Sequence, residues 1–348
     1  MVDFVPIESI KHVAEASAIA EIQAFLTGEY SLSEIPFDRD LLSESFLDYI
    51  KHETTNTWDD PEYFIKEPET CYQEARLYVE REASNHLLDY QEKLKDHYPF
   101  QISGASRNIL TRKENVSPVG LSYIWLKLYF LSAYGENYLQ FEGTGSSGEK
   151  KRFLKVFEKI FEFLAIFAAS GKCESKAAWV TGPSRSATDL LNIFNDICTY
   201  TGQGRVKDIT DLQKNQRTTN DGRIDGIVIT EANGNLEEDS EIYLVQATIQ
   251  KSALKDKTVT NENIKFFNDF FAQQLSYSKS GMLVVPHKSN PLHKSECASG
   301  NCVYIPLERL FVYLGQASLE GNMGAIGTEF TSKYADFSSH SINCEVFN

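Results

Sequence analysis

The chain has 348 residues, 42% of them hydrophobic and 24% charged, which is the composition of an ordinary globular protein with a sizeable core. Its net charge of −15 argues against a protein that covers nucleic acid without sequence preference, because such a protein would be basic overall. The N-terminus lacks a signal peptide, and the apolar stretches are too short or too interrupted to cross a bilayer. We therefore expect a cytoplasmic protein that does not enter the membrane and keeps its six cysteines reduced.

Residues 1–141 form the first predicted region, which is mainly helical. Apolar spacing predicts helices over 7–28, within 60–98 and over 117–135. The first 60 residues hold thirteen acidic and three basic side chains, which indicates a solvated acidic surface or a partner-binding surface. We expect this region to recognise DNA or to bind a partner. A Gly- and Ser-rich segment at 142–150 predicts a linker and places a domain boundary there.

Residues 142–348 form the second predicted region, in which helices and strands alternate. The pattern predicts helices over 149–170, 186–202 and 262–277, and strands within 177–186 and over 224–230, 241–249 and 280–287. A strand that turns into a helix is predicted over 302–316. This order is typical of an α/β domain with a mixed sheet flanked by helices.

Two β-like runs, "RIDGIVIT" and "LVQATIQK", carry the strongest functional pattern. Asp225 opens the first run and Gln246 lies inside the second, with a polar turn between them. If the runs pair as adjacent strands, the two side chains can meet at one end of the pair. Oxygen-bearing side chains held close together are the ligands that a divalent cation such as Mg²⁺ or Mn²⁺ requires.

These runs resemble the PD-(D/E)XK nuclease superfamily, and most closely its restriction-endonuclease-like (Mrr-like) proteins of bacterial defence systems. The resemblance covers residues from about 150 to 315. It implies a restriction-endonuclease-like core and hydrolysis of DNA with Mg²⁺ or Mn²⁺. By the same resemblance, Asp225 binds the metal, Gln246 replaces the usual glutamate, and Ala247 offers its carbonyl. A helical acidic residue completes such sites, and Glu158, or Glu162 one turn later, is available for that role.

The sequence departs from the family pattern at one catalytic position. Thr248 stands two residues after Gln246, where the family has lysine. Lys251 is the next candidate, and it can serve only if the strand ends near Ile249 and the chain then turns. The pattern leaves two further lysines open for the same role, Lys255 and Lys257.

The function predicted from this resemblance is a metal-dependent DNA endonuclease of the restriction or anti-phage type. Its partner is DNA, together with other defence-system subunits where these are required, and double-strand cleavage by a one-site nuclease often implies a homodimer. The neutral Gln246 and the missing lysine at position 248 favour an alternative, an inactive nuclease-fold module that binds DNA or a protein. A mainly helical adaptor without a nucleic-acid role is a third hypothesis.

Two other motifs have ordinary structural explanations. The spacing of His287, His293, Cys297 and Cys302 is looser than in zinc sites, so a surface loop is the simpler interpretation. His287 also ends a predicted strand, where active-site residues gather. Arg185 precedes a predicted helix and offers a phosphate contact, although a capped helix start explains the same residues.

Overall fold

The structure is a computed structural model that describes most of the 348 residues. The described residues are 7–35, 68–104, 107–134, 146–182, 187–208, 210, 224–231, 235–250, 254–289, 291–299 and 302–335. Within them, no helix is both long enough and apolar enough to span a membrane.

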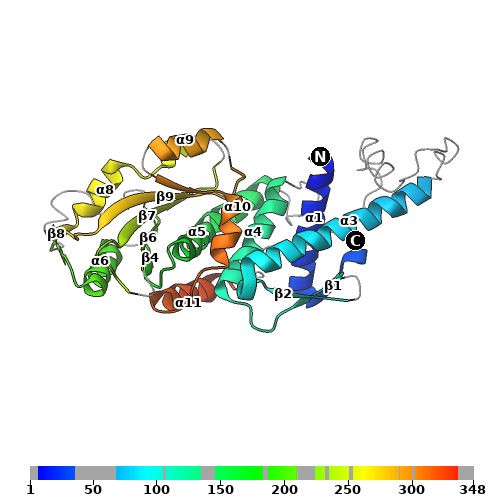
Figure 1. Ribbon diagram of the computed structural model, residues 1–348, viewed down its shortest axis with the longest axis horizontal. Coiled ribbons are helices and arrows are strands. Elements are labelled where there is room, and N and C mark those ends of the chain that lie inside the picture. Colours follow the sequence, from blue (N-terminus) through cyan, green and yellow to red (C-terminus); the bar gives the residue numbers. More distant parts are fainter. Residues whose placement is uncertain are drawn as a thin grey trace.

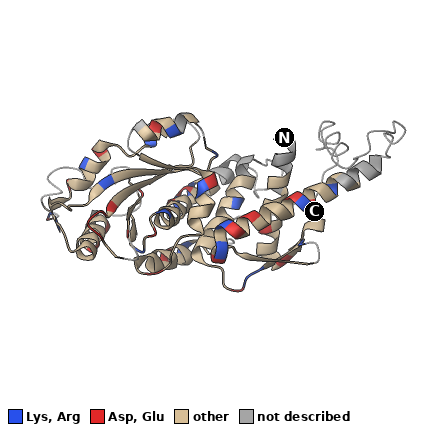
Figure 2. Cartoon of the chain, viewed as in Figure 1, with Lys and Arg blue, Asp and Glu red and all other residues tan. Residues whose placement is uncertain are grey.

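The first part of the chain combines long helices with a small sheet (Figure 1). The helices are α1 (Ile7–Thr27), α3 (Pro68–Leu94) and α4 (Pro118–Tyr134), so the three predicted helices are confirmed. The sheet was not predicted, and its antiparallel strands lie in the order β1 (Glu29–Ser31), β3 (Ile109–Arg112) and β2 (Phe100–Ser103). Figure 2 shows acidic and basic positions interspersed along α3.

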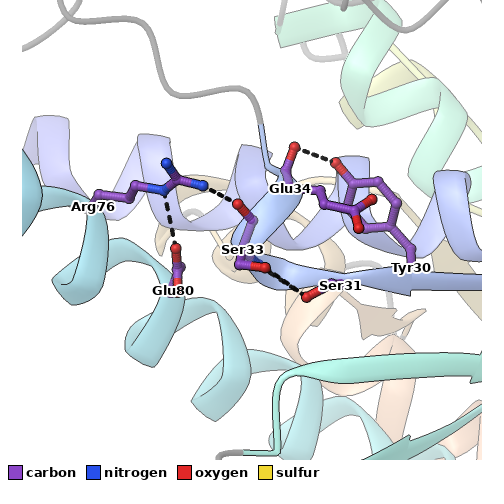
Figure 3. Close-up of polar contacts among 6 residues, drawn as sticks. All are labelled: Tyr30, Ser31, Ser33, Glu34, Arg76 and Glu80. Carbon is purple, nitrogen blue, oxygen red and sulfur yellow. Dashed lines mark hydrogen bonds and ion pairs between the residues drawn. The ribbon is translucent and has the colours of Figure 1, made fainter.

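Short polar contacts fix the chain that leaves the small sheet (Figure 3). Arg76 on α3 donates to the Ser33 carbonyl and pairs with Glu80, with 3.1 Å between Nε and Oε1. Tyr30 donates its hydroxyl to the Glu34 carbonyl at 2.7 Å. Burial, with Glu34 as the second cause, raises the pKa of Tyr30 to about 12, so the phenol remains a donor at neutral pH. These contacts hold the short 3-10 helix η1 (Leu32–Glu34) against α3.

A five-stranded mixed sheet forms the centre of the second part. Its order is β10 (Cys302–Ile305), β9 (Ser278–Val284), β7 (Glu241–Ala247), β6 (Gly226–Ile229) and β4 (Ala178–Val180). β6 is antiparallel to both of its neighbours, whereas β7, β9 and β10 are parallel to one another. The carboxyl ends of β4, β7, β9 and β10 and the start of β6 therefore lie along one edge of the sheet, which we call the 225 edge.

Helices cover both faces of this sheet, as the sequence predicted. α5 (Ser146–Lys172) packs on one face, against β4, β6 and β7. α6 (Ala187–Thr201) and α8 (Asn261–Asn268) contribute to the separate core on the other face. β6 is buried along its whole length, which explains its uninterrupted apolar sequence.

One hydrophobic core extends across the predicted boundary at residues 141 and 142. It includes side chains from α1, α4 and α5 and from two late helices, α10 (Leu307–Leu314) and α11 (Asn322–Tyr334). α10 packs against both α3 and α5, and α11 packs against both α4 and α5. α5 itself begins at Ser146, inside the segment predicted as a linker. The two regions thus share a core, and their separate functional roles stay predictions.

A buried ion pair lies in this shared core. Lys127 Nζ on α4 is 3.0 Å from Glu21 Oε2 on α1, and neither side chain is more than 2% exposed. The hydroxyls of Tyr98 and Tyr123 donate to Glu21 Oε1 at 3.0 and 2.6 Å. The Lys127 ammonium also lies 3.6 Å from the centre of the Tyr90 ring. The charges are therefore paired, hydrogen-bonded and enclosed by aromatic rings, as buried charges must be.

Several elements differ from the sequence predictions. The helix predicted over 262–277 ends at Asn268, and the chain then forms β8 (Phe271–Gln273), which pairs with β5 (Arg205–Val206). The segment predicted as a surface loop contains α9 (Pro291–Ser299). α11 was not predicted. The strands over 224–230, 241–249 and 280–287 and the strand-helix pair over 302–316 are confirmed as β6, β7, β9, β10 and α10.

Candidate functional site

Asp225 and Gln246 lie together at the 225 edge. Asp225 directly precedes β6, and Gln246 is the second-last residue of β7, its antiparallel neighbour. The regular register ends with Gly226 opposite Val245. Beyond it, the Asp225 N–H donates to the Val245 carbonyl at 2.8 Å, and Asp225 Oδ2 accepts the Ala247 N–H at 2.7 Å. The Asp225 carboxylate thus touches the peptide bond that joins Gln246 to Ala247.

Both side chains are largely enclosed by protein. Asp225 is 7% exposed and Gln246 is 6% exposed. On the β4 side, the Thr181 N–H donates to the Asp225 carbonyl at 2.9 Å, and the Thr181 hydroxyl donates to the Ile224 carbonyl at 2.6 Å. The chain at the start of β6 is therefore held from both neighbouring strands. These bonds, together with the bond to the Ala247 N–H, hold the Asp225 carboxylate in one place, which a site for a cation requires.

Helix α5 approaches the same edge through two glycines. A Cβ added at Gly226 would overlap Ile166 on α5, and a Cβ added at Gly182 would overlap the carboxylate of Glu162. Gly182 follows Thr181, the residue bonded to Asp225. Glu162 therefore brings a second carboxylate to the 225 edge, two residues beyond the end of β4.

Glu158 occupies a different environment, although it lies one turn earlier on the same helix. Its side chain is exposed, whereas that of Glu162 is half-buried against Gly182. The sequence left both residues open as the helical acidic ligand, since positions i and i+4 share a helix face. The packing of α5 over Gly226 favours Glu162 as the acidic residue nearer the sheet edge.

A cavity of about 200 Å³ opens beside Glu162. It lies between α5, the end of β4, α6 and α11, and its lining includes Lys159, Glu162, Val180, Gly182, Asp189 and Tyr334. Burial, and then the nearby carboxylates of Glu162 and Glu329, raise the pKa of Tyr334, so this phenol stays protonated at neutral pH. The cavity is therefore polar, and it carries both acidic and basic groups.

The chain turns directly after β7. The strand ends at Ala247, and the Gln250 N–H then bonds to the Thr248 hydroxyl at 3.3 Å, a local bond that is typical of a turn. His287, beyond the end of β9, donates Nε2–H to the Ile249 carbonyl across a distance of 2.7 Å. The strand ends near Ile249, which is the first part of the condition that the sequence set for Lys251. Lys251 itself lies outside the described residues.

The oxygen atoms at this edge are of the type that Mg²⁺ or Mn²⁺ binds, but they do not form a complete ligand set. In the described part of the chain, no three His, Cys, Asp or Glu side chains come together as metal ligands. Asp225 supplies a charged oxygen beside the Gln246–Ala247 peptide bond, and Glu162 supplies a second carboxylate at Gly182. Carboxylate, amide and backbone carbonyl oxygens suit a hard divalent cation, so the donor chemistry fits such an ion.

Among the residues that the structure describes, the remaining motifs give no second site. Cys297 and Cys302 are buried free thiols, and a hydrogen bond that the Cys297 thiol donates to Cys302, together with burial, raises the pKa of Cys297. These thiols belong to the core between α9 and β10, and the described residues complete no zinc site around them. The His293 side chain and Arg185 lie outside the described residues.

Comparison with known proteins gives one distant likeness. No protein-family model matches the chain, and no curated protein matches it. A solved structure described as MspJI restriction endonuclease in complex with a 27-mer oligonucleotide is similar to it with a TM-score of 0.20 and 13% identity. The match covers 57% of this chain and 38% of that one. At this TM-score the likeness establishes no shared fold, so the function is argued below from the site itself.

Proposed function

We propose that the chain is a metal-dependent DNA endonuclease of the restriction or anti-phage type, with its active site at the 225 edge. The contact between the Asp225 carboxylate and the peptide bond of Gln246 and Ala247 is the observation that carries the proposal. It brings a rigid carboxylate, an amide side chain and a backbone carbonyl to adjacent strand ends. The sequence pattern of a restriction-endonuclease-like core assigns metal binding to the same residues.

Each residue has a definite role in this proposal. The Asp225 carboxylate, the Ala247 carbonyl and the Gln246 side-chain oxygen would hold Mg²⁺ or Mn²⁺, and Glu162, rather than the exposed Glu158, would supply the second carboxylate. When bound, the cation supplies Lewis-acid chemistry for hydrolysis of a phosphodiester. A lysine after the turn, with Lys251 in first place, would orient the attacking water. Burial of Asp225 and Gln246 limits competing contacts with solvent.

The proposal extends to the partners of the chain. A protein with one such site cuts one strand at a time, so double-strand cleavage would require two copies acting together. Further defence-system subunits would recruit the chain to its target, and the mainly helical first part offers a surface for them. These statements about partners depend on the proposed cleavage reaction.

The test is cleavage of plasmid DNA by the full-length protein with Mg²⁺ or Mn²⁺. Asp225→Asn is the informative variant, because its amide oxygen can still accept the Ala247 N–H while the negative charge is lost. Loss of a residue that hydrogen-bonds to a metal ligand lowers activity roughly 10- to 100-fold. We expect loss of the charged metal ligand itself to lower activity further. Asp239→Asn, in the exposed turn before β7, is the matched control and should cut like the wild type. Equal cleavage by Asp225→Asn and the wild type would refute the proposal.

A second candidate function is a nuclease-like module that binds DNA without cutting it. The uncharged Gln246, and the lack of a cluster of three metal-binding side chains among the described residues, favour it. It predicts that the wild type retains DNA in a gel-shift assay yet leaves plasmid intact with either cation. Cleavage that depends on Asp225 would exclude this candidate.

A further inference from the structure

Exposed basic side chains flank the candidate site on both sides along the 225 edge. On one side, Lys159 is exposed on α5 and lines the cavity beside Gly182, just past the end of β4. On the other side, Lys288 follows the end of β9, and Arg309 lies in the first turn of α10, just past the end of β10. Asp225 and Gln246 lie between the two groups, because the sheet order places β6 and β7 there.

Hydrogen bonds hold Lys288 and Arg309 close to each other. The Leu307 N–H donates to the His287 carbonyl at 2.9 Å. The Ser289 N–H donates to both carboxylate oxygens of Glu308, at 2.9 and 3.1 Å. The backbone on either side of Lys288 is therefore tied to Leu307 and Glu308, the two residues that precede Arg309. His287 also bonds to Ile249, which fixes this loop to the turn after β7.

Carboxylates lie near these three basic residues without pairing with them, Glu162 and Asp189 in the cavity that Lys159 lines and Glu308 beside Arg309. Some basic side chains elsewhere pair with carboxylates, as Lys176 does with Glu320 and Lys333 with Glu329, whereas others, such as Lys294 and Arg205, form no ion pair with a described residue. Across the described residues, Lys159, Lys288 and Arg309 make no ion pair. Glu308, the nearest carboxylate in sequence to Arg309, instead accepts the Ser289 N–H. In a chain with a net charge of −15, positive charge left unpaired at one sheet edge is available to an anionic partner.

The spacing along the edge fits duplex DNA. Four strand-to-strand steps separate β4 from β10, and at about 4.8 Å each they span roughly 19 Å. The major groove separates the two backbones of B-DNA by about 12 Å, so the edge is wide enough to reach across it. A duplex lying over the strand ends can therefore bring phosphates to both groups of basic residues.

We infer that Lys159, Lys288 and Arg309 form a phosphate-contacting surface that seats the sugar-phosphate backbones of duplex DNA across the 225 edge. The inference rests on the proposed function, and it adds the surface and the orientation of the substrate. Such contacts position DNA without reading its sequence, so they predict binding that depends on salt and not on base order.

The test is an equilibrium binding measurement with the full-length protein in EDTA, which prevents hydrolysis. The probe is a fluorescent duplex of about 30 base pairs, roughly three helical turns. The affinity is measured between about 50 and 200 mM salt for the wild type, Lys288→Glu, Arg309→Glu, Lys159→Glu and a matched control. Arg205→Glu serves as that control, since Arg205 is exposed on β5, which pairs with β8 at the far end from α10 (Figure 1).

Each variant at the edge should weaken binding roughly eightfold at about 0.1 M salt and reduce the slope of log affinity against log salt by about 0.9. The control should bind like the wild type, and all variants should keep the wild-type melting temperature. The inference is overturned if the wild type fails to retain the duplex at low salt. It is equally overturned if the edge variants bind as the control does. If Asp225→Asn cuts DNA as the wild type does, the proposed active site is wrong. The binding measurement, made without hydrolysis, still tests the phosphate-contacting surface independently.

Discussion

Removing one partner of the buried ion pair in the shared core should strongly destabilise the protein. In Lys127→Met the Glu21 carboxylate remains fully buried, 0% exposed, and keeps only the two phenol donors. Burial, and then the Glu21 charge, raise the pKa values of Tyr98 and Tyr123, so these phenols stay protonated and cannot neutralise the carboxylate. Breaking a buried pair from one side costs about 3–5 kcal/mol, and we expect that loss in the free energy of unfolding.

Urea denaturation, followed by circular dichroism, measures the effect. The double variant Glu21→Gln/Lys127→Met should lose clearly less than the sum of the two single variants, because no charge then remains unpaired. Lys93→Met is the matched control. Lys93 pairs with Asp89 at 2.6 Å on the surface of α3, where the side chains are 34% and 49% exposed, so its loss should cost less than about 1 kcal/mol. Additive single effects, or a cost for Lys127→Met as small as the control's, would refute the reasoning.

Three further predictions follow from single contacts. Burial lowers the pKa of His86 below its usual 6.5, so the folded state binds fewer protons than the unfolded state and the stability falls as the pH drops below that value. The variant His86→Gln should therefore lose less melting temperature than the wild type between neutral and acid pH. Gly226→Ala should cost about 1–3 kcal/mol in urea denaturation by crowding Ile166, and Ile166→Val should recover part of it. His287→Ala should lower the rate constant of DNA cleavage more than it weakens DNA binding. His287→Gln retains an N–H donor toward the Ile249 carbonyl and should recover cleavage activity. Equal loss of activity in both variants would exclude a positioning role for His287.

The sequence correctly predicts those elements whose apolar pattern fits only one kind of secondary structure. Long amphipathic or apolar stretches give α1, α4 and α5, and apolar runs bounded by polar turns give β6, β7 and β9. The segment Phe266–Phe271 is apolar at both helical and strand spacing, so its period does not show where α8 ends and β8 begins. The strands of the small sheet are only three or four residues long, too short to give a period, and β1 pairs with β3 across 80 residues of chain at the pair Tyr30 and Leu110.

The candidate site was predictable only in part, for a similar reason. Asp225 and Gln246 are separated by a turn, and local strand pairing brings their backbones together. The preference for Glu162 over Glu158 depends on how closely α5 packs over Gly226, and no periodicity in the sequence reports that distance. The bond from His287 to Ile249 joins residues 38 positions apart, so it follows from the parallel pairing of β7 and β9 and from nothing local.

Calorimetric titration with Mn²⁺ tests most directly whether the 225 edge holds a cation. The wild type should bind one ion per chain, and Asp225→Asn should bind none while keeping its fold. Wild-type protein that takes up no Mn²⁺, or an Asp225→Asn variant that binds it equally well, would contradict the account.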